Sequence, residues 1–479
     1  MERRNGVLWV AGFLLAFLFT EFCLFARWGL NVLLCTAGAL ALAAWYAGRV
    51  RRESIGLIIA CLAAALPFML YDNDFFHFLD GVLLLALLPI TVATMLGGRA
   101  YRRGSPAVVA DWAHAALVLP VVGIPQGFQA FSGLFRGKGR RWLGILLGML
   151  IAIPLLAVVV PLLLRADSSF ANMLGGLGEL FCSVPRYIFD LVFAFCASVY
   201  LAAQYLRLRR GDREMPPLQP RQRKGWDPWI CLTVIAIACG VYLLYAISQL
   251  GNVMALLQGG APANFSVAEY ARQGFFELTA VCAINFGLLA LVHAFVRRLE
   301  NGSFTLATRV LLGTLCGLTL LLIASAFSKM SLYIGTYGLT PLRVYTSAFM
   351  ILLAFCFLVW LVKLCWNRVP LFKLLSCAAL VVFLALQALN PDALIPSWNL
   401  AIARNGQQEL DTGTLYALSA DSVPVVYPAL KGRDDEELEW WIRDMKNRVG
   451  DGDPWYSYNL ARSRARRILS AVQLPEERE

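Results

Sequence analysis

The stretch "SVAEYARQGFFELTAV" at 266–281 brings charged side chains to the start of an apolar segment. At the helical repeat, Glu269, Arg272 and Glu277 fall on one face. Glu277 lies roughly 16 Å beyond Ser266 along such a helix. An isolated charge at that depth costs about 2.5–3.5 kcal/mol. We therefore expect Glu277 to be protonated, paired or hydrated, and to mark a polar site inside the membrane. A purely structural ion pair is the alternative, and "SVAE" also matches a capping box that would account for Glu269.

We expect Glu277 to have three neighbours from a later part of the chain. Lys329 lies at the outer end of one apolar segment, Arg343 at the start of the next, and Tyr337 in the connection between them. A Lys329–Glu277 pair would compensate both charges in apolar surroundings. The alternative is a lysine that extends its ammonium group to the membrane surface. We include all three residues in the predicted intramembrane site.

A second candidate site is the acidic stretch "YDNDFFHFLD" at 71–80. Carboxylate oxygens are the ligands that Mg²⁺ prefers, so Asp72 and Asp74 are candidate metal ligands for a phosphate-bearing substrate. An acidic outer turn without metal is the alternative. Glu21 and Asp190 lie close to the ends of apolar segments, where a side chain can reach outward to water.

The elements that must position these residues are membrane-spanning helices. Of the 479 residues, 59% are hydrophobic and 15% are charged, which is too apolar for a soluble protein. Lipid cannot satisfy open backbone groups, so each apolar run of about 20 residues must be a helix. The sequence predicts an all-α, polytopic membrane protein with eleven spans: 7–26, 30–48, 55–71, 79–97, 142–164, 187–206, 229–250, 275–296, 309–326, 344–366 and 371–389.

The net charge of +11 is explained by orientation. With the N-terminus in the cytoplasm, most Lys and Arg residues fall in the inner segments, as the positive-inside rule requires. We therefore expect membrane lipids as partners, no nucleic acid and no cofactor. The twelve cysteines include no CxxC pair, and nearly all lie within spans, so a disulfide framework is not supported. With eleven spans the C-terminus is outside, where its 90 residues have a possible protein partner.

The chain divides into four predicted regions. Residues 1–206 form a first bundle, in which the Pro- and Gly-interrupted stretch 98–141 is an interfacial or re-entrant segment. A basic, Pro-rich cytoplasmic linker follows at 207–228. Residues 229–389 form a second bundle, and 390–479 a small helical domain. That domain begins at "NPDALI", where Pro391 suits a first helical position, and continues with four short helices within 411–472.

Three motifs resemble a known family: "EYARQGFFELTAV", "SAFSKMSLYIGTYGLTPLRVYTSAFM" and "ALNPDALIPSWNLAIA". Together they resemble the bacterial membrane proteins built on the domain of unknown function numbered 4173, which is related to the one numbered 4153. The resemblance covers about residues 60–479. It implies a multi-pass protein of the bacterial cell membrane with a small C-terminal region, and it implies no catalytic residues.

Three hypotheses for function remain open, in order of preference. The first is solute or ion handling through a polar path lined by Glu277, Arg272 and Lys329. The second is a non-enzymatic envelope sensor or signalling partner that displays the C-terminal region. The third is a membrane-embedded transferase with a lipid-linked substrate, using Asp72 and Asp74. The familiar motifs of soluble enzymes are absent from the sequence, so we favour a non-enzymatic function.

Overall fold

The structure is a computed structural model of the chain. It describes residues 2–97, 107–134, 177–210, 228–257, 275–296, 304–366, 368–404, 412–431 and 436–472, and the isolated positions 148, 152 and 159. The chain forms two compact units. Unit 1 comprises Met1–Pro217 and Gly450–Ser463, and unit 2 comprises Leu218–Val449 and Arg464–Glu479. The boundary at Pro217 and Leu218 falls within the expected linker.

The described residues of unit 1 form five long apolar helical segments. They are α1 (Glu2–Phe19) with its π-helical continuation η1 (Thr20–Leu24), α2 (Leu30–Ala47), α3 (Arg52–Ala65) with α4 (Pro67–Leu70), α5 (Asp74–Met95), and α11 (Leu177–Arg210). Local chemistry sets the ends of these helices. Gly48 ends α2 with a φ of 78°, which favours glycine, and the Asn73 side chain caps α5 by accepting from the Phe76 amide.

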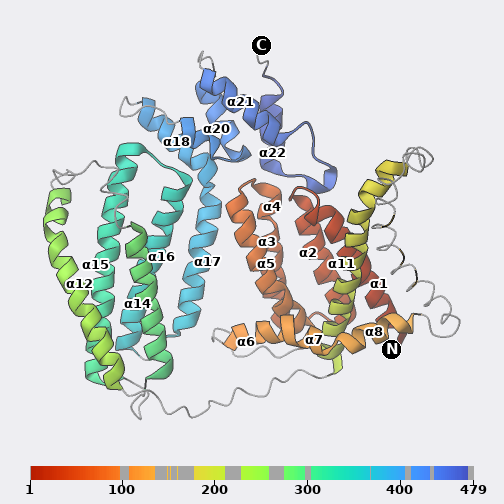
Figure 1. Ribbon diagram of the computed structural model, residues 1–479, viewed down its shortest axis with the longest axis horizontal. Coiled ribbons are helices and arrows are strands. Elements are labelled where there is room, and N and C mark those ends of the chain that lie inside the picture. The colour runs from red at the N-terminus through yellow and green to blue at the C-terminus, as the bar shows by residue number, and fades with distance from the viewer. Residues whose placement is uncertain are drawn as a thin grey trace. The chain divides into compact units, whose positions relative to one another are not determined.

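A bent helical segment crosses the ends of these spans, as Figure 1 shows. It consists of α6 (Ala107–Ala113), the π-helical η2 (His114–Val118), α7 (Leu119–Val122) and α8 (Ile124–Gly133). The pieces on either side of Gly123 are bent by 55°. Within the described residues, this geometry is that of a broken span or a re-entrant segment.

Side chains of α11 hold this bent segment by its backbone carbonyls. The π-turn leaves the Ala115 carbonyl outside the helical register, and Pro120 has no amide hydrogen to offer Ala116. Gln204 Nε2 donates to the Ala115 oxygen at 2.8 Å, and Tyr200 Oη donates to the Ala116 oxygen at 2.6 Å. The break in the helix is therefore compensated by two hydrogen bonds from one neighbour.

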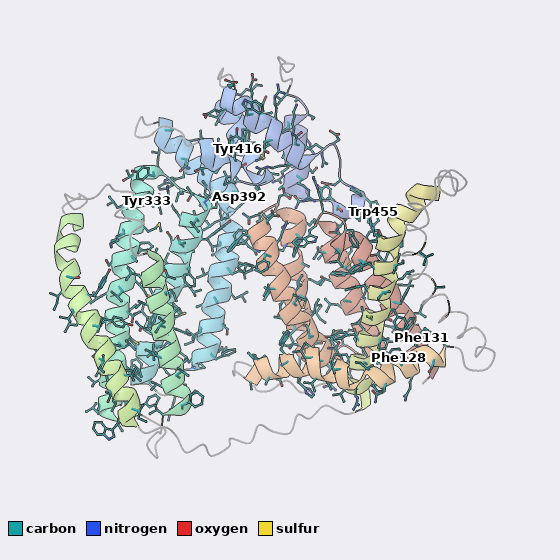
Figure 2. All side chains as sticks on the ribbon, in the orientation of Figure 1. Phe128, Phe131, Tyr333, Asp392, Tyr416 and Trp455 are labelled. Carbon is teal, nitrogen blue, oxygen red and sulfur yellow. The ribbon has the colours of Figure 1, made fainter. Side chains whose placement is uncertain are left out.

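Close packing and aromatic contacts complete this attachment. A Cβ atom added at Gly127 would lie 2.6 Å from the Val199 carbonyl oxygen of α11, which is the close approach that small residues allow between membrane helices. Phe131, labelled in Figure 2, has its ring centroid 4.7 Å from that of Trp9 and 5.3 Å from that of Phe195. These three rings join α8 to α1 and α11.

Unit 2 contains a second set of apolar helices: α12 (Pro228–Leu257), α14 (Phe275–Phe295), α15 (Leu306–Tyr337), α16 (Pro341–Cys365) and α17 (Leu371–Leu389). The side chains of Thr305 and Thr340 cap α15 and α16, and Pro341 occupies the first turn of α16. Gly338 ends α15 with a φ of 73°.

The C-terminal part of unit 2 is helical, as expected. The helices are α18 (Pro391–Arg404), α19 (Thr412–Tyr416), η3 (Ala420–Ser422), α20 (Val423–Leu430) and α21 (Glu436–Val449). The expected helix start at Pro391 is confirmed. Trp441 is 1% exposed in the small core of this region, whereas Trp440 is 59% exposed. The last helix, α22 (Leu460–Leu469), begins in unit 1 and continues into unit 2.

The predicted fold class is confirmed. Nine described helices are long and apolar enough to cross a membrane, or ten if the bent segment counts as one span. These nine correspond to nine of the eleven expected spans. The expected span 229–250 lies in α12, whose described apolar stretch, Leu232–Ser248, is shorter than the others. The expected span 142–164 lies outside the described residues, apart from isolated positions. The orientation in the membrane stays a prediction.

Candidate intramembrane sites

The predicted site around Glu277 falls largely outside the described residues. Glu269 and Arg272 lie outside them, together with the predicted capping box. Glu277 is the third residue of α14, and its side chain is not among those described. Lys329 lies in α15 and is buried, with 7% of the residue exposed. Its predicted pairing with Glu277 stays a prediction.

Two of the predicted site residues, Tyr337 and Arg343, lie together at the end of α15. Arg343 Nη1 donates to the carbonyl oxygens of Tyr337 at 2.9 Å and of Gly338 at 2.5 Å. Its guanidinium carbon lies 4.0 Å from the ring centroid of Tyr333, which Figure 2 labels. A cation stabilises a helix C-terminus by meeting its free carbonyls. The Arg343 side chain therefore caps the C-terminus of α15.

The same helix end is held by Asn399 of α18. Its amide oxygen accepts from the Leu339 amide at 2.8 Å, and its amide nitrogen donates to the Leu339 oxygen at 2.9 Å. A Cβ atom added at Gly338 would lie 2.7 Å from Asn399 Oδ1. The glycine therefore serves both the positive φ and the close approach of this side chain.

A buried polar chain joins three helices of unit 2. Tyr242 Oη donates to Asn285 Oδ1 at 2.9 Å, and Asn285 Nδ2 donates to Thr319 Oγ1 at 2.9 Å. Thr319 in turn donates to the Leu315 carbonyl at 2.7 Å. Asn285 and Thr319 are fully buried. Since each member has a partner, we assign this chain to packing of α12, α14 and α15.

The candidate metal ligands of unit 1 are Asp72 and Asp74, and Asp72 contacts an arginine. Asp72 Oδ1 accepts from Arg462 Nη1 at 2.7 Å, and Asp74 is the first residue of α5. Among the described residues, no group of three His, Cys, Asp or Glu side chains could hold a metal ion. Burial raises the pKa of the Asp72 carboxyl, and the positive charge of Arg462 opposes that rise.

Arg462 is the centre of a buried polar cluster in unit 1. Its side chain is 6% exposed. Besides Asp72, Nε donates to Asp453 Oδ2 at 3.0 Å, and Nη2 donates to the carbonyl oxygens of Trp28 and Ser457, both at 2.9 Å. Two carboxylates and two carbonyls thus surround one guanidinium group. This arrangement satisfies the charges and ties the C-terminal residues of unit 1 to its first helices.

Asp190 is a buried acidic residue of unit 1. The sequence left open whether its side chain reaches outward, and in the structure Asp190 is fully buried within the span Arg186–Arg209. Neither carboxylate oxygen has a hydrogen-bond partner among the described residues. The signal available in the sequence was that Asp190 is the only charged residue of the expected span 187–206.

The contacts of α11 show which way Asp190 faces. Arg186 Nη2 lies 2.7 Å from Glu21 Oε2, and the Phe193 ring stacks on Phe19 at 6.3 Å between centroids. Positions 186, 190 and 193 share one face of a helix. Asp190 therefore lies on the face of α11 that contacts α1 and η1.

Comparison with known proteins gives a family but no activity. A model of the family described as a domain of unknown function, DUF4153, matches residues 57–429. No curated protein and no solved structure matches the chain. The predicted resemblance to the domain numbered 4173 is thereby corrected to its relative, numbered 4153. The three motifs were sufficient to find this group of related families, and they did not distinguish between its members.

Proposed function

We propose, from the premise that the chain belongs to the family of the domain of unknown function DUF4153, that it handles a monovalent cation at Asp190. The cation is a proton or an alkali-metal ion, and its binding is coupled to movement of a solute or of the ion itself. The observation that carries this proposal is the fully buried carboxyl group of Asp190, without a hydrogen-bond partner among the described residues.

The charge of the Asp190 carboxyl group is costly at this position. An ionised carboxylate inside a span costs about 2.5–3.5 kcal/mol unless something compensates it. Among the described residues no hydrogen-bond partner offsets this cost at Asp190, and a bound proton or metal cation would offset it. A group that must carry a cation to be stable is the type of residue found in proton relays and ion pathways.

The nearest basic residue along the helix does not provide this compensation. Arg186 lies one turn before Asp190, but its guanidinium group pairs with Glu21 at 2.7 Å. The same group lies 4.8 Å from the ring centroid of Phe25. The pairing with Glu21 thus engages Arg186, which favours a diffusible cation as the partner of Asp190.

The π-helical segment opposite Asp190 gives further support. In η1 the Phe25 amide donates to the Thr20 oxygen at 3.2 Å, five residues back. Such π-turns often occur at functional sites. Backbone carbonyl oxygens of this widened turn would be available, beside the Asp190 carboxyl, as ligands for an alkali-metal ion.

Labelling with dicyclohexylcarbodiimide tests the proposal, because this lipid-soluble reagent modifies protonated carboxyl groups in apolar surroundings. We expect mass spectrometry of the purified protein in lipid nanodiscs to locate the modification at Asp190. Glu21 is the internal control, since its carboxylate already has a partner in Arg186 at 2.7 Å. Sodium that slows labelling at fixed pH would identify a sodium site, and dependence on pH alone would identify a proton site.

Two results would overturn the proposal. One is an unmodified Asp190 at every pH. The other is modification of Glu277 in place of Asp190, which would return the site to unit 2. A functional counterpart uses proteoliposomes with an internal pH- or sodium-sensitive dye. Asp190→Asn should abolish cation flux, and Glu53→Gln, at an exposed residue in the first turn of α3, should retain it.

A further inference from the structure

The residues Gly450–Ser463, called the docked segment below, belong to unit 1 although the chain on both sides of them belongs to unit 2. The segment includes η4 (Trp455–Ser457) and the first turns of α22. Its backbone and side chains reach the start of α2, the helix α4 and the residue that follows α4. The Leu30 amide donates to the Tyr458 oxygen at 2.9 Å, and Asn459 Nδ2 donates to the oxygens of Phe68 and Tyr71 at 2.9 and 2.6 Å.

The docked segment packs so closely against Gly29 that no larger residue fits at this position. A Cβ atom added at Gly29 would lie 2.5 Å from the carbonyl oxygens of both Ser457 and Tyr458. Arg462 adds the charged contacts, with Asp453 from the docked segment itself and Asp72 from the connection before α5. The contact is thus close, polar and largely buried.

The docked segment also reaches the helix that faces Asp190. The Tyr456 ring stacks on Phe22 of η1, with 4.5 Å between centroids and 28° between the planes. Farther along, the Trp28 indole donates to the Cys23 carbonyl at 2.8 Å, and Arg462 donates to the Trp28 carbonyl at 2.9 Å. Asn31 Nδ2 donates to the Phe22 carbonyl. A continuous set of bonds and ring contacts therefore links Arg462 to the π-helical turn beside Asp190.

We infer that the docked segment closes the Asp190 site to water at this end of unit 1, and that its release opens the site. This inference rests on the function proposed above. Tyr456 covers η1 while Arg462 holds the segment in place. Loss of the Arg462 contacts would free Tyr456 from Phe22 and expose the η1 end of the helix pair.

A water-soluble carbodiimide with an amine nucleophile tests this inference in the full chain, because the reagent reaches Asp190 only from water. We expect Arg462→Ala to raise the rate of Asp190 modification at least about fivefold, by enlarging the open population. Arg464→Ala is the matched control, since Arg464 is exposed on the same helix. Tyr456→Ala is a second variant, matched by Trp455→Ala at a side chain that is 70% exposed.

The two carbodiimides separate the possible failures. In one outcome the lipid-soluble reagent modifies Asp190 in every variant, and the water-soluble reagent modifies it at the same rate as in the unaltered protein. The inference that the docked segment closes the site is then overturned, and the proposed function stands. If neither reagent modifies Asp190 in any variant, the proposed function is overturned, and the inference falls with it. If Arg462→Ala does not fold, Tyr456→Ala alone decides, and an unchanged rate in that variant overturns the inference.

Discussion

Arg462 Nη1 lies 2.7 Å from Asp72 Oδ1, although 390 positions of sequence separate the two residues. Only 6% of the arginine side chain and 23% of the aspartate side chain are exposed. Asp453 Oδ2 lies 3.0 Å from the same guanidinium group. Removing one member of a buried ionic cluster leaves the others uncompensated, so this cluster should be sensitive to single substitutions.

The first prediction concerns the coupling of Arg462 with Asp72. Arg462→Ala should lower the free energy of unfolding by about 3–5 kcal/mol, because two carboxylates lose their main cation. Asp72→Ala should cost less, since Asp453 still pairs with Arg462. The double variant should cost less than the sum of the two single variants, and denaturant titration in mixed micelles measures the difference. Strict additivity would contradict a direct interaction.

The second prediction is a pH dependence carried by Asp72. Burial raises the pKa of this carboxyl above its ordinary value of 3.8. The folded state therefore binds the proton more tightly than the unfolded state. Its contribution to stability is complete below pH 3.8 and is lost as pH rises through the folded-state value.

Asp72→Asn isolates this effect, because it removes the titration and keeps the shape of the side chain. The unfolding free energy of the unaltered protein minus that of Asp72→Asn should fall as pH rises through the acidic range. Thermal unfolding at a series of pH values measures this difference. A difference that increases with pH would mean that attraction to Arg462 outweighs burial.

The third prediction concerns the hydrogen bond from Tyr200 to the Ala116 carbonyl. Tyr200→Phe removes the donor and leaves an oxygen that Pro120 cannot satisfy, so it should cost about 1–3 kcal/mol. Tyr187→Phe on the same helix is the control, because Tyr187 is 49% exposed. Thermal unfolding of both variants in detergent gives the comparison. Equal melting temperatures would show that water or lipid replaces the Tyr200 bond.

The fourth prediction compares two glycines of α8. At Gly127 an added methyl group meets the Val199 carbonyl oxygen at 2.6 Å, whereas at Gly133 it meets nothing within 4 Å. Gly127→Ala should destabilise the protein by about 1–3 kcal/mol through overpacking. Gly133→Ala should be neutral or slightly stabilising, because alanine favours helix. The same thermal measurement decides, and a neutral Gly127→Ala would show that α8 can move away from α11.

The spans could be predicted from sequence because lipid leaves a long apolar segment with one main choice, the helix. The start of α18 could be predicted too, because Pro391 fixes a first helical position. The prolines and glycines of the bent segment at 107–133 indicated that it is not a continuous span. The sequence did not indicate that side chains of α11 would satisfy its carbonyls.

The candidate site was harder to predict because burial of a charge depends on which helices become neighbours. Glu277 was the leading candidate because it lies far along its predicted helix from the membrane surface. Asp190 lies closer to the end of its predicted span. The contacts of Arg186 and Phe193 with α1 and η1 bury Asp190 nevertheless. Arg462 did carry a local signal: it shares a helix face with the buried Ala465 and Leu469. Its partner Asp72 could not be found without the fold.

The last prediction concerns Asn399, whose side-chain amide pairs with both backbone groups of Leu339, at 2.8 and 2.9 Å. Asn399→Asp keeps the acceptor for the Leu339 amide, but it places a carboxylate oxygen against the Leu339 carbonyl oxygen. The substitution should cost about 1–3 kcal/mol, since a partly buried carbonyl loses its donor.

Ser397→Ala is the matched control on the same helix. The Ser397 hydroxyl is exposed and donates to the Ala393 carbonyl of its own helix at 2.7 Å. Its removal should change stability by no more than about 0.5 kcal/mol. One outcome is that Asn399→Asp has the melting temperature of the unaltered protein at neutral pH and loses stability only when its carboxyl is protonated. In that case the amide is not needed as a donor. A loss at neutral pH that lessens on acidification, as a protonated carboxyl regains a donor hydrogen, would establish that α18 holds the end of α15 by this two-way pairing.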